Sequence, residues 1–163
     1  MKIAFCASEV VPFSKTGGLA DVCGSLPLAL AKLGQEVMVV IPLYKAAREQ
    51  KAAVLTRFAD DIWTTVIGRN TRVYFVENDA YFHRDGIYGD KAGDYPDNLE
   101  RFAFFNKRCL RLFRELGFRP DILHCHDWQT SLLPVYLKAL PAGDDFFRKT
   151  RTLLTIHNIG YQG

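Results

Sequence analysis

The first 42 residues place an apolar run, a glycine turn, a helical stripe and a second apolar run in succession. Residues 2–7 and 36–41 are short and almost continuously apolar, which is typical of strands buried on both faces of a parallel sheet. Between them a stripe of apolar residues recurs at helical spacing and ends before Gly34: Leu19, Val22, Leu26, Leu30 and Leu33. The order strand, helix, strand predicts a βαβ unit with a right-handed crossover.

The rest of the chain continues this alternation of strands and helices. Segments with strand character are residues 62–66, 72–76, 122–125 and 152–156, and segments with helical spacing are residues 97–116 and 128–139. The first two strand segments flank Gly68-Arg69-Asn70-Thr71, which predicts a hairpin. Strands that alternate with helices predict an α/β fold with a mainly parallel sheet, and such sheets bind ligands beyond the carboxyl ends of their strands.

Several regions are less regular, and each carries an expectation. Pro27 lies inside the first helical stripe and predicts a kink or break near Ser25-Leu26. Three segments are expected to be irregular, as an exposed segment, a long loop and a polar linker: residues 44–60, 78–98 and 141–149. In residues 97–116 an apolar and aromatic stripe is expected to face the core, with the charged residues, Arg101 and Arg108 among them, mostly on other faces.

Composition and charge limit the kind of protein that this chain can be. Its 163 residues fit one domain, 48% of them are apolar, and the charges are mixed, as in a soluble globular protein. A net charge of +3 without a dense basic run argues against a nucleic-acid partner. No segment reaches the roughly 20 apolar residues of a membrane span, and the apolar run after Lys2 is too short for a signal peptide. We therefore expect a cytoplasmic protein that binds neither nucleic acid nor membrane.

The cysteines point to the same compartment. None of the four forms a Cys-x-x-Cys pair, and each lies in an apolar segment: Cys6, Cys23, Cys109 and Cys125. This distribution favours buried, reduced thiols over disulfides or a metal site.

The glycine turn is the first candidate site. Gly17 and Gly18 let backbone N–H groups approach a ligand closely, and the helix that follows directs its free N–H groups and positive dipole end at the same place. Lys15 adds a positive charge and Asp21 a carboxylate. This combination suits an anionic or heavily hydroxylated ligand, whereas the simpler alternative is a strand-to-helix turn with a solvated lysine. The stretch matches neither the phosphate loop nor the Gly-x-Gly-x-x-Gly pattern.

Two more polar clusters follow strands, at His124-Cys125-His126-Asp127-Trp128 and at His157-Asn158. In a strand, His124 and His126 share one face, so they have the spacing of metal ligands, although a buried histidine with a local hydrogen bond is the more ordinary interpretation. Asp127 is either the N-cap of the next helix or an acceptor for sugar hydroxyls. His157 and Asn158 either end their strand or offer donors and acceptors to a sugar. All three clusters are expected to converge on one rim of the sheet.

Four blocks, in order along the chain, resemble bacterial glycogen synthases and plant starch synthases. They are Ser8-Glu9-Val10-Val11-Pro12 with Lys15 to Val22, Tyr95-Pro96-Asp97-Asn98 with Arg101-Phe102, His124 to Trp128, and Thr155 to Gly163. The resemblance therefore extends from one end of the chain to the other. It implies a Rossmann-like sheet with helices on both faces, the N-terminal domain of a two-domain GT-B glycosyltransferase.

The resemblance also implies an activity. These hexosyltransferases move glucose from ADP-glucose, less often UDP-glucose, to the 4-hydroxyl at the non-reducing end of an α-1,4-glucan, and the anomeric configuration is retained. Family members need no metal or cofactor, so none is expected. The partners expected for this chain are ADP-glucose, glycogen or starch, and the C-terminal domain of the same enzyme.

Matching positions suggest roles for individual residues. The histidine that corresponds to His157 lines the glucose pocket, and Asp127 lies at or near the active site, so these two are the catalytic candidates. The expected substrate-binding residues are Lys15, Gly17, Gly18, Asp21, Asn158 and Tyr95, although Tyr95 can equally serve to pack the long loop.

The family's second, nucleotide-binding domain has no counterpart in residues 1–163, so we expect the isolated chain to be inactive and its sheet edge to favour self-association. Two other functions remain open at this stage. One is a non-catalytic α/β module that binds a glucan or nucleotide. The other is a metal-dependent hydrolase built on His124 and His126.

Overall fold

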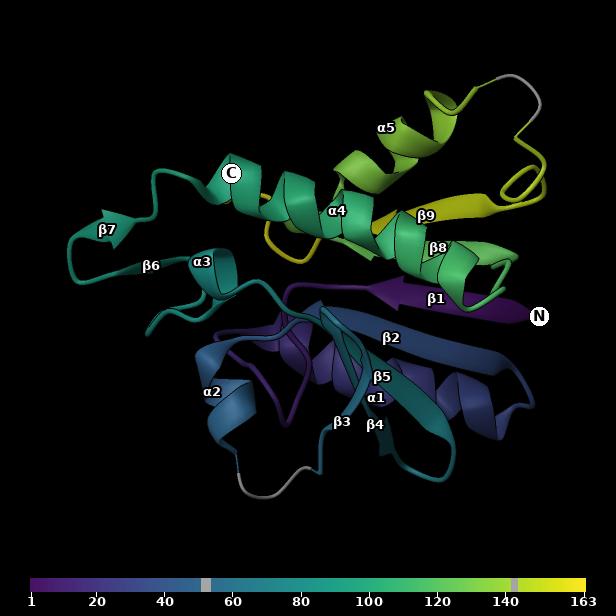
Figure 1. The fold of residues 1–163 in the computed structure, drawn as a ribbon, viewed down its shortest axis with the longest axis horizontal. Helices are drawn as coiled ribbons and strands as arrows, with labels where there is room; N and C mark the ends of the chain where they lie inside the picture. The colour runs from purple at the N-terminus through teal and green to yellow at the C-terminus, as the bar shows by residue number, and fades with distance from the viewer. Residues whose placement is uncertain (51–53, 142–143) are drawn as a thin grey trace.

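A seven-stranded sheet runs through the computed structural model, which describes residues 1–50, 54–141 and 144–163 (Figure 1). In spatial order its strands are β3 (Thr56–Ala59), β4 (Ile62–Ile67), β5 (Thr71–Val76), β2 (Glu36–Pro42), β1 (Lys2–Cys6), β8 (Ile122–His126) and β9 (Arg151–Thr155). The neighbours from β5 to β9 pair in parallel, and β4 is antiparallel to both β3 and β5. The predicted α/β fold with a mainly parallel sheet is confirmed, as is the hairpin around Gly68.

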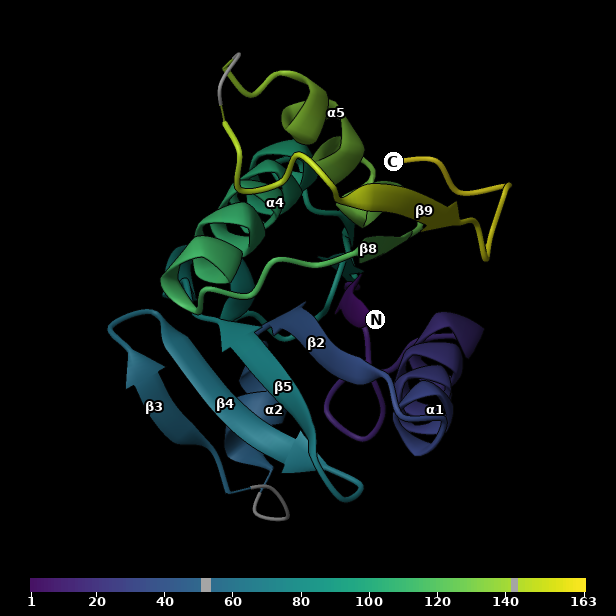
Figure 2. The same cartoon turned by 90° about the vertical axis from the view of Figure 1, so that its right-hand side faces the viewer.

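Helices cover both faces of the sheet. Helix α1 (Gly18–Lys32) lies on one face, and α4 (Asn98–Glu115) with α5 (Leu132–Lys138) lies on the other (Figures 1 and 2). The pleat of β1 explains the two layers, because alternate side chains point to opposite faces. Ile3 and Phe5 belong to the core under α1, while Ala4 and Cys6 belong to the core under α4. This arrangement buries Ile3 through Cys6 of β1, an interior strand whose carboxyl end leads into the site.

Helix α1 is continuous through Pro27, so the break expected near Ser25 is wrong. The helix rests on the sheet through an unbroken buried stripe, Leu19, Ala20, Cys23, Gly24 and Pro27, and this packing supports the helix where proline removes one hydrogen bond. Gly24 allows the close approach of α1 to the chain after β1, since a Cβ there would lie 2.3 Å from a methyl group of Val11.

The segment between β5 and α4 is more ordered than the predicted long loop. It contains α3 (Asp79–Phe82), whose Tyr81 amide donates to the Asn78 side chain, and a two-stranded hairpin of β6 (Gly89–Asp90) and β7 (Gly93–Asp94). Arg101 holds this segment against α4, because its guanidinium donates to the carbonyls of Tyr81 and Ile87 and to the Asn98 side chain.

Two arginines of α4 are buried, so the expectation that its charges lie on outer faces is wrong for them. Arg101 is fully buried and Arg108 is 6% exposed. Arg108 forms ion pairs with Asp61 at 2.5 Å and Glu115 at 2.9 Å. Their long side chains pack in the core while their charged ends meet acceptors, which hydrophobic periodicity does not reveal.

Three other segments also differ from expectation. Residues 44–60 include α2 (Lys45–Glu49) and β3, and residues 51–53 of that segment lie outside the described part. In the expected polar linker, Phe147 is buried beside the Arg114 guanidinium, and residues 142–143 lie outside the described part. The helix expected over residues 128–139 is a 3-10 turn (Trp128–Thr130) followed by α5.

The structure also tests the predictions about the cysteines and about membrane-spanning segments. All four cysteines are free and buried, as predicted. Within the described ranges no helix has both the length and the apolar composition needed to cross a membrane.

Replacing Arg101 with methionine should destabilise the fold. The change keeps most of the side-chain volume but leaves three acceptors without their donor, so we expect a loss of about 2–4 kcal/mol in the free energy of unfolding, measured with urea. The control is Arg111→Met, since Arg111 is exposed and pairs only with Glu115 among the described residues. That control should change the free energy by less than about 0.5 kcal/mol. Equal losses in the two variants would contradict the role of Arg101.

Candidate functional site

The carboxyl ends of β1, β8 and β9 lie side by side, because β1 pairs with β8 and β8 with β9 in parallel. Residues 8–18, 127–128 and 157–158 follow these three ends, and we call them the rim. Cys23 on α1 lies near both Asp127 and Glu9, which belong to different parts of the rim. Burial raises the pKa of the Cys23 thiol, and the charges of these two carboxylates raise that pKa further. The predicted convergence of the three polar clusters is confirmed.

Glu9 holds the glycine turn in place. Its side chain is 3% exposed and accepts hydrogen bonds from the Thr16 amide, from the Thr16 hydroxyl at 2.7 Å and from the Gly17 amide at 3.4 Å. Tyr88, from the segment before α4, donates its hydroxyl proton to the same carboxylate at 2.5 Å. The Gly17 amide therefore faces Glu9, and the amides left for a ligand are those that begin α1 at Gly18.

The surface above the glycines is open. Gly17 has an extended backbone, with φ of −149°, that any residue can adopt, so its value lies in the missing side chain. A Cβ at Gly17 or Gly18 would meet no atom within 4 Å, which leaves room for a ligand against the backbone. Lys15 donates to both carboxylate oxygens of Asp21 at 2.7 Å. Both side chains are about half exposed, so an anionic ligand can compete for Lys15.

Asp127 fastens the end of β9 to the end of β8. One carboxylate oxygen accepts hydrogen bonds from the amides of His157 at 2.6 Å and Asn158 at 3.4 Å. It makes no side-chain cap to the turn that follows, so the N-cap alternative is wrong. The backbone of Asp127 has φ of 56°, a conformation uncommon for residues other than glycine. Its amide also donates to the Thr155 carbonyl at 2.9 Å, and these bonds hold the strained residue in place.

Two buried histidines, His124 and His126, lie behind the rim and lead to His157 within it. His124 and His126 lie on one face of β8, as predicted, with ring centroids 4.1 Å apart. His124 bonds the Thr155 hydroxyl at 2.7 Å, and His126 Nδ1 bonds His157 Nε2 at 2.9 Å. The ordinary interpretation of His124, a buried ring with a local hydrogen bond, is therefore confirmed. Within the described residues no group of three or more histidine, cysteine or acidic side chains is arranged to hold a metal ion.

Tyr95 and Asn158 have structural contacts of their own. The Tyr95 hydroxyl accepts a hydrogen bond from the Gly86 amide, and its ring lies 4.9 Å from the Arg101 guanidinium. The Asn158 side-chain oxygen accepts from the Gly160 amide at 3.0 Å. Both residues thus order the segments that carry them, and their action on a ligand stays a prediction.

A hollow of about 530 Å³ opens next to Asp127. Its walls combine aromatic rings with polar groups from the segment before α4, from the first turns of α4, from the turn after β8 and from the C-terminal residues: Tyr95, Asn98, Phe102, Trp128, Ser131 and Tyr161. Tyr161 donates its hydroxyl proton to Asp94 at 2.6 Å, a bond that raises the pKa of Tyr161 to about 12 and joins two walls. Flat rings beside hydrogen-bonding groups suit sugar rings.

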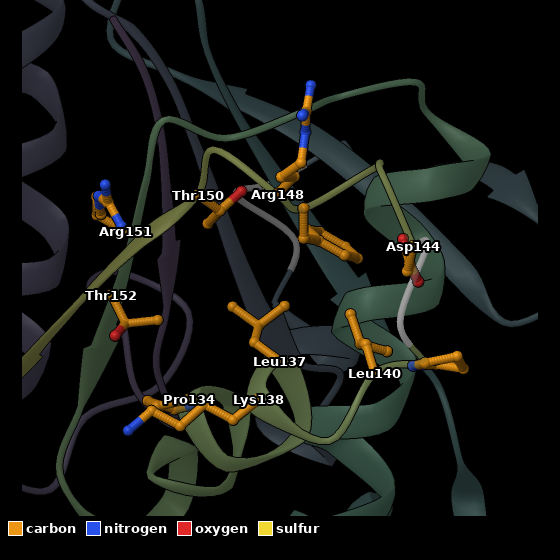
Figure 3. Close-up of a pocket in the computed structure, with 11 residues that line it drawn as sticks. Pro134, Leu137, Lys138, Leu140, Asp144, Arg148, Thr150, Arg151 and Thr152 are labelled. Atoms are coloured by element: carbon orange, nitrogen blue, oxygen red, sulfur yellow. The ribbon is translucent and has the colours of Figure 1, made fainter.

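A second hollow, of about 380 Å³, lies at the opposite end of the sheet (Figure 3). Leu137 and Leu140 line it at the end of α5, and Thr150 and Thr152 line it where β9 begins. Since the rim lies where β9 ends, this second hollow is separate from the rim.

Comparison with known proteins assigns the fold to a family. The family profile of the starch synthase catalytic domain matches residues 2–163. The chain belongs to this family. Among similar proteins, the glycogen synthase of Syntrophotalea carbinolica is 46% identical over 174 residues, and that of Koribacter versatilis is 48% identical over 174 residues. Each alignment covers 100% of this chain but only 36% of the relative. The chain therefore spans about a third of the length of these two relatives.

Solved structures agree with the assignment. The catalytic domain of starch synthase IV from Arabidopsis thaliana, bound to ADP and acarbose, matches with a TM-score of 0.76 and 28% identity, over 96% of this chain and 34% of that one. A sucrose-phosphate synthase from Thermosynechococcus elongatus matches with a TM-score of 0.62 at 14% identity, over 98% of this chain and 33% of that one, which shows a shared fold. The expected resemblance and GT-B fold are thus confirmed for this starch synthase family chain.

Residue patterns do not reveal the role of Glu9 in the rim or that of Tyr88, which contacts it. In the sequence, Glu9 stands out only as part of a motif, and Tyr88 lies in the expected long loop. The available signal was the position of Glu9, directly after a buried strand and before a glycine pair whose amides need an acceptor. Tyr88 gave no comparable signal, because it reaches Glu9 from 79 residues away in the sequence.

Replacing Glu9 with glutamine should loosen the glycine turn of this starch synthase family chain. Glutamine has the same shape but loses the charge and one acceptor oxygen, so the two amides and two hydroxyls around it cannot all be satisfied. We expect the free energy of unfolding in urea to fall by about 1–3 kcal/mol. Glu36→Gln is the matched control, because Glu36 is exposed and its pair with Lys2 is 3.6 Å long. A control loss as large as that of Glu9→Gln would refute the assignment.

The buried histidines should make stability depend on pH. Burial, with smaller effects from neighbouring histidines, lowers the pKa of His126 to about 3 and that of His124 to about 4. The unfolded chain, with a histidine pKa near 6.5, binds more protons below that value than the folded chain does. The histidine contribution to stability is therefore complete above about pH 6.5 and is lost as the pH falls toward 4.

We expect each of these histidines to contribute a slope of about 1.4 kcal/mol per pH unit in that window. Urea unfolding between about pH 6 and 5 should show a slope for His126→Gln that is smaller than the wild-type slope by roughly that amount. His83→Gln makes the same change at an exposed site and should keep the wild-type slope. Identical slopes for all three proteins would show that His126 does not carry the effect.

Proposed function

We propose that this chain forms one half of the active site of a retaining hexosyltransferase, a glycogen or starch synthase. The reaction moves glucose from ADP-glucose to the 4-hydroxyl at the non-reducing end of an α-1,4-glucan. The observation that carries the proposal is the rim, where the glycine turn, Asp127 and His157 follow three adjacent strands in a chain that matches the family over residues 2–163. The names of the similar proteins, glycogen synthases, and the ADP and acarbose of the solved starch synthase support it.

The glycine turn suits the diphosphate of the donor. A leaving diphosphate develops negative charge, and catalysis needs cations or N–H dipoles directed at that charge. Lys15 offers the cation, and the start of α1 at Gly18 offers free amides and the positive end of a helix dipole. Asp21 holds Lys15 near this place until the diphosphate replaces it as the partner.

The ends of β8 and β9 suit the glucose. Asp127 orients the backbone of His157 and Asn158 through hydrogen bonds from their amides, so all three residues lie at one end of the sheet. Together these three side chains offer donors and acceptors to sugar hydroxyls. In this proposal Asp127 and His157 contact the reacting sugar, and Asn158 contributes to binding.

The hollow beside Asp127 suits the acceptor glucan. Trp128 and Tyr161 provide ring surfaces, and Tyr95 with Asn98 provides polar edges. A glucan chain in this hollow would bring its terminal hydroxyl toward the rim.

The remaining components of the site belong to a second, nucleotide-binding domain. The chain matches about a third of each relative, and transfer needs cationic groups and a nucleotide pocket beyond those described here. We therefore propose that residues 1–163 are inactive alone and act only with that second domain.

Transfer of glucose from ADP-glucose to glycogen tests the proposal. The assay compares this chain alone with a chimera in which the chain replaces the matching third of the Koribacter versatilis glycogen synthase, and with that synthase unchanged. We expect transfer by the chimera and none by the chain alone. A folded chimera that binds oligosaccharide but transfers no glucose would favour a non-catalytic binding module, and activity of the chain alone would refute the need for two domains.

Within the chimera, Lys15→Ala should lower kcat/KM for ADP-glucose about 10²-fold, because it removes a cation aimed at the leaving diphosphate. Lys32→Ala, at the other end of the same helix, is the matched control and should retain wild-type kinetics. Wild-type turnover and KM in Lys15→Ala would exclude the assigned role of Lys15.

A further inference from the structure

The ring of His157 is held by a second histidine that the proposed reaction does not use. His126 Nδ1 lies 2.9 Å from His157 Nε2, and the two rings stack with centroids 5.2 Å apart and planes 21° apart. His157 is partly exposed at the rim, while His126 is completely buried behind it. One hydrogen bond therefore connects a ring that can reach a ligand with a ring that cannot.

His126 has little freedom to move or to change its contacts. Its ring packs against Phe5, with centroids 5.5 Å apart, and against the rings of His124 and His157. Its backbone amide donates to the Thr130 hydroxyl at 2.6 Å. Its other ring nitrogen, Nε2, is buried and has no hydrogen-bond partner within the described part of the chain.

The unpartnered nitrogen decides where the protons lie. If His157 donated through Nε2, neutral His126 would accept at Nδ1 and carry its own proton on Nε2, where the N–H would be buried without an acceptor. If His126 donates through Nδ1, its Nε2 carries only a lone pair, and His157 accepts at Nε2. A buried N–H without an acceptor is rarer and costlier in proteins than an unused acceptor. The second arrangement is therefore favoured.

We propose that His126 is a positioning residue that fixes neutral His157 in the tautomer with its proton on Nδ1. His157 then meets a ligand as a hydrogen-bond donor at Nδ1, which suits a hydroxyl or other oxygen of the donor sugar. In this tautomer no ring nitrogen of His157 is free to act as a general base, because Nε2 is engaged by His126. The part of the proposal that concerns the ligand rests on the proposed function, and the part that concerns the tautomer does not.

The low basicity of His126 agrees with this arrangement. Burial, with smaller effects from His124 and His157, lowers its pKa to about 3, so the ring is neutral at physiological pH. A neutral His126 has a single ring proton, and with that proton on Nδ1 the ring can donate a hydrogen bond to His157 Nε2.

Nitrogen NMR of the 163-residue chain, without any ligand, tests the tautomer directly. Long-range correlations between the ring protons and nitrogens of each histidine distinguish a protonated from an unprotonated nitrogen. For both His157 and His126 at slightly alkaline pH, we expect Nδ1 to have the shift of a protonated nitrogen and Nε2 that of an unprotonated one. A protonated Nε2 in wild-type His157 would overturn the proposal even if no variant folded.

Three variants separate the hydrogen bond from packing. His126→Phe keeps the stacked ring but removes the donor, so His157 should shift toward the Nε2-protonated form that a free imidazole prefers. His126→Asn places an amide N–H near the original Nδ1 and should restore the Nδ1-protonated form. His124→Phe alters the same stack without touching the bond and should leave His157 unchanged. An unchanged His157 pattern in His126→Phe would also overturn the proposal.

Kinetics of the chimera test the consequence for the ligand. His126→Phe should lower kcat/KM for ADP-glucose about tenfold, as expected for one misdirected hydrogen bond, and His126→Asn should recover most of that loss. If the NMR result is as expected but the chimera transfers no glucose, the proposed function fails and the tautomer stands. If the chimera is active but His157 carries its proton on Nε2, the inference fails and the proposed function stands.

Discussion

Backbone N–H groups at the ends of parallel strands need acceptors, and in this chain two buried carboxylates provide them. Glu9 accepts from the turn after β1, and Asp127 accepts from the segment after β9. Hydrogen bonds to an ionised carboxylate are roughly twice as strong as neutral ones, so each carboxylate fixes the course of a whole segment. Asp127 keeps a positive φ because these bonds hold it there. These hydrogen bonds within the chain shape the rim, which is the preorganisation that the proposed transfer reaction would require.

Tyr88 connects the glycine turn with the hollow beside Asp127. Its hydroxyl bonds Glu9 under the glycine turn, and its carbonyl accepts hydrogen bonds from the Tyr95 amide at 2.9 Å and the Asn98 side chain at 2.8 Å. Tyr95 and Asn98 line the hollow beside Asp127. The glycine turn and the walls of the hollow are therefore joined by the hydrogen bonds of one residue, Tyr88. Arg101, buried under the same segment, holds it in place through the carbonyls of Tyr81 and Ile87.

The sequence predicted the architecture and the location of the site because both follow from local patterns. Apolar strands, a helical stripe and glycine turns place Lys15, Asp127 and His157 at one end of the sheet without any knowledge of contacts. What it could not predict depends on pairs of residues far apart in the chain. Burial of Arg101 follows from carbonyls 14 and 20 residues away, and the bond between His126 and His157 joins residues 31 apart. Helical periodicity treats an arginine as exposed, and strand alternation shows that two histidines share a face but not what they touch.

Hydrogen exchange of individual amides would test the central claim, that buried carboxylates hold the rim in shape without a ligand. The informative amides are those of Thr16 and His157, which donate to Glu9 and Asp127, compared with an amide at the exposed end of the chain such as that of Gln162. The account predicts that Thr16 and His157 exchange much more slowly than Gln162 in the chain alone, and that binding of a ligand adds little to their protection. Exchange of Thr16 and His157 as fast as that of Gln162 would show that the rim is formed only when a ligand binds, and would contradict the account.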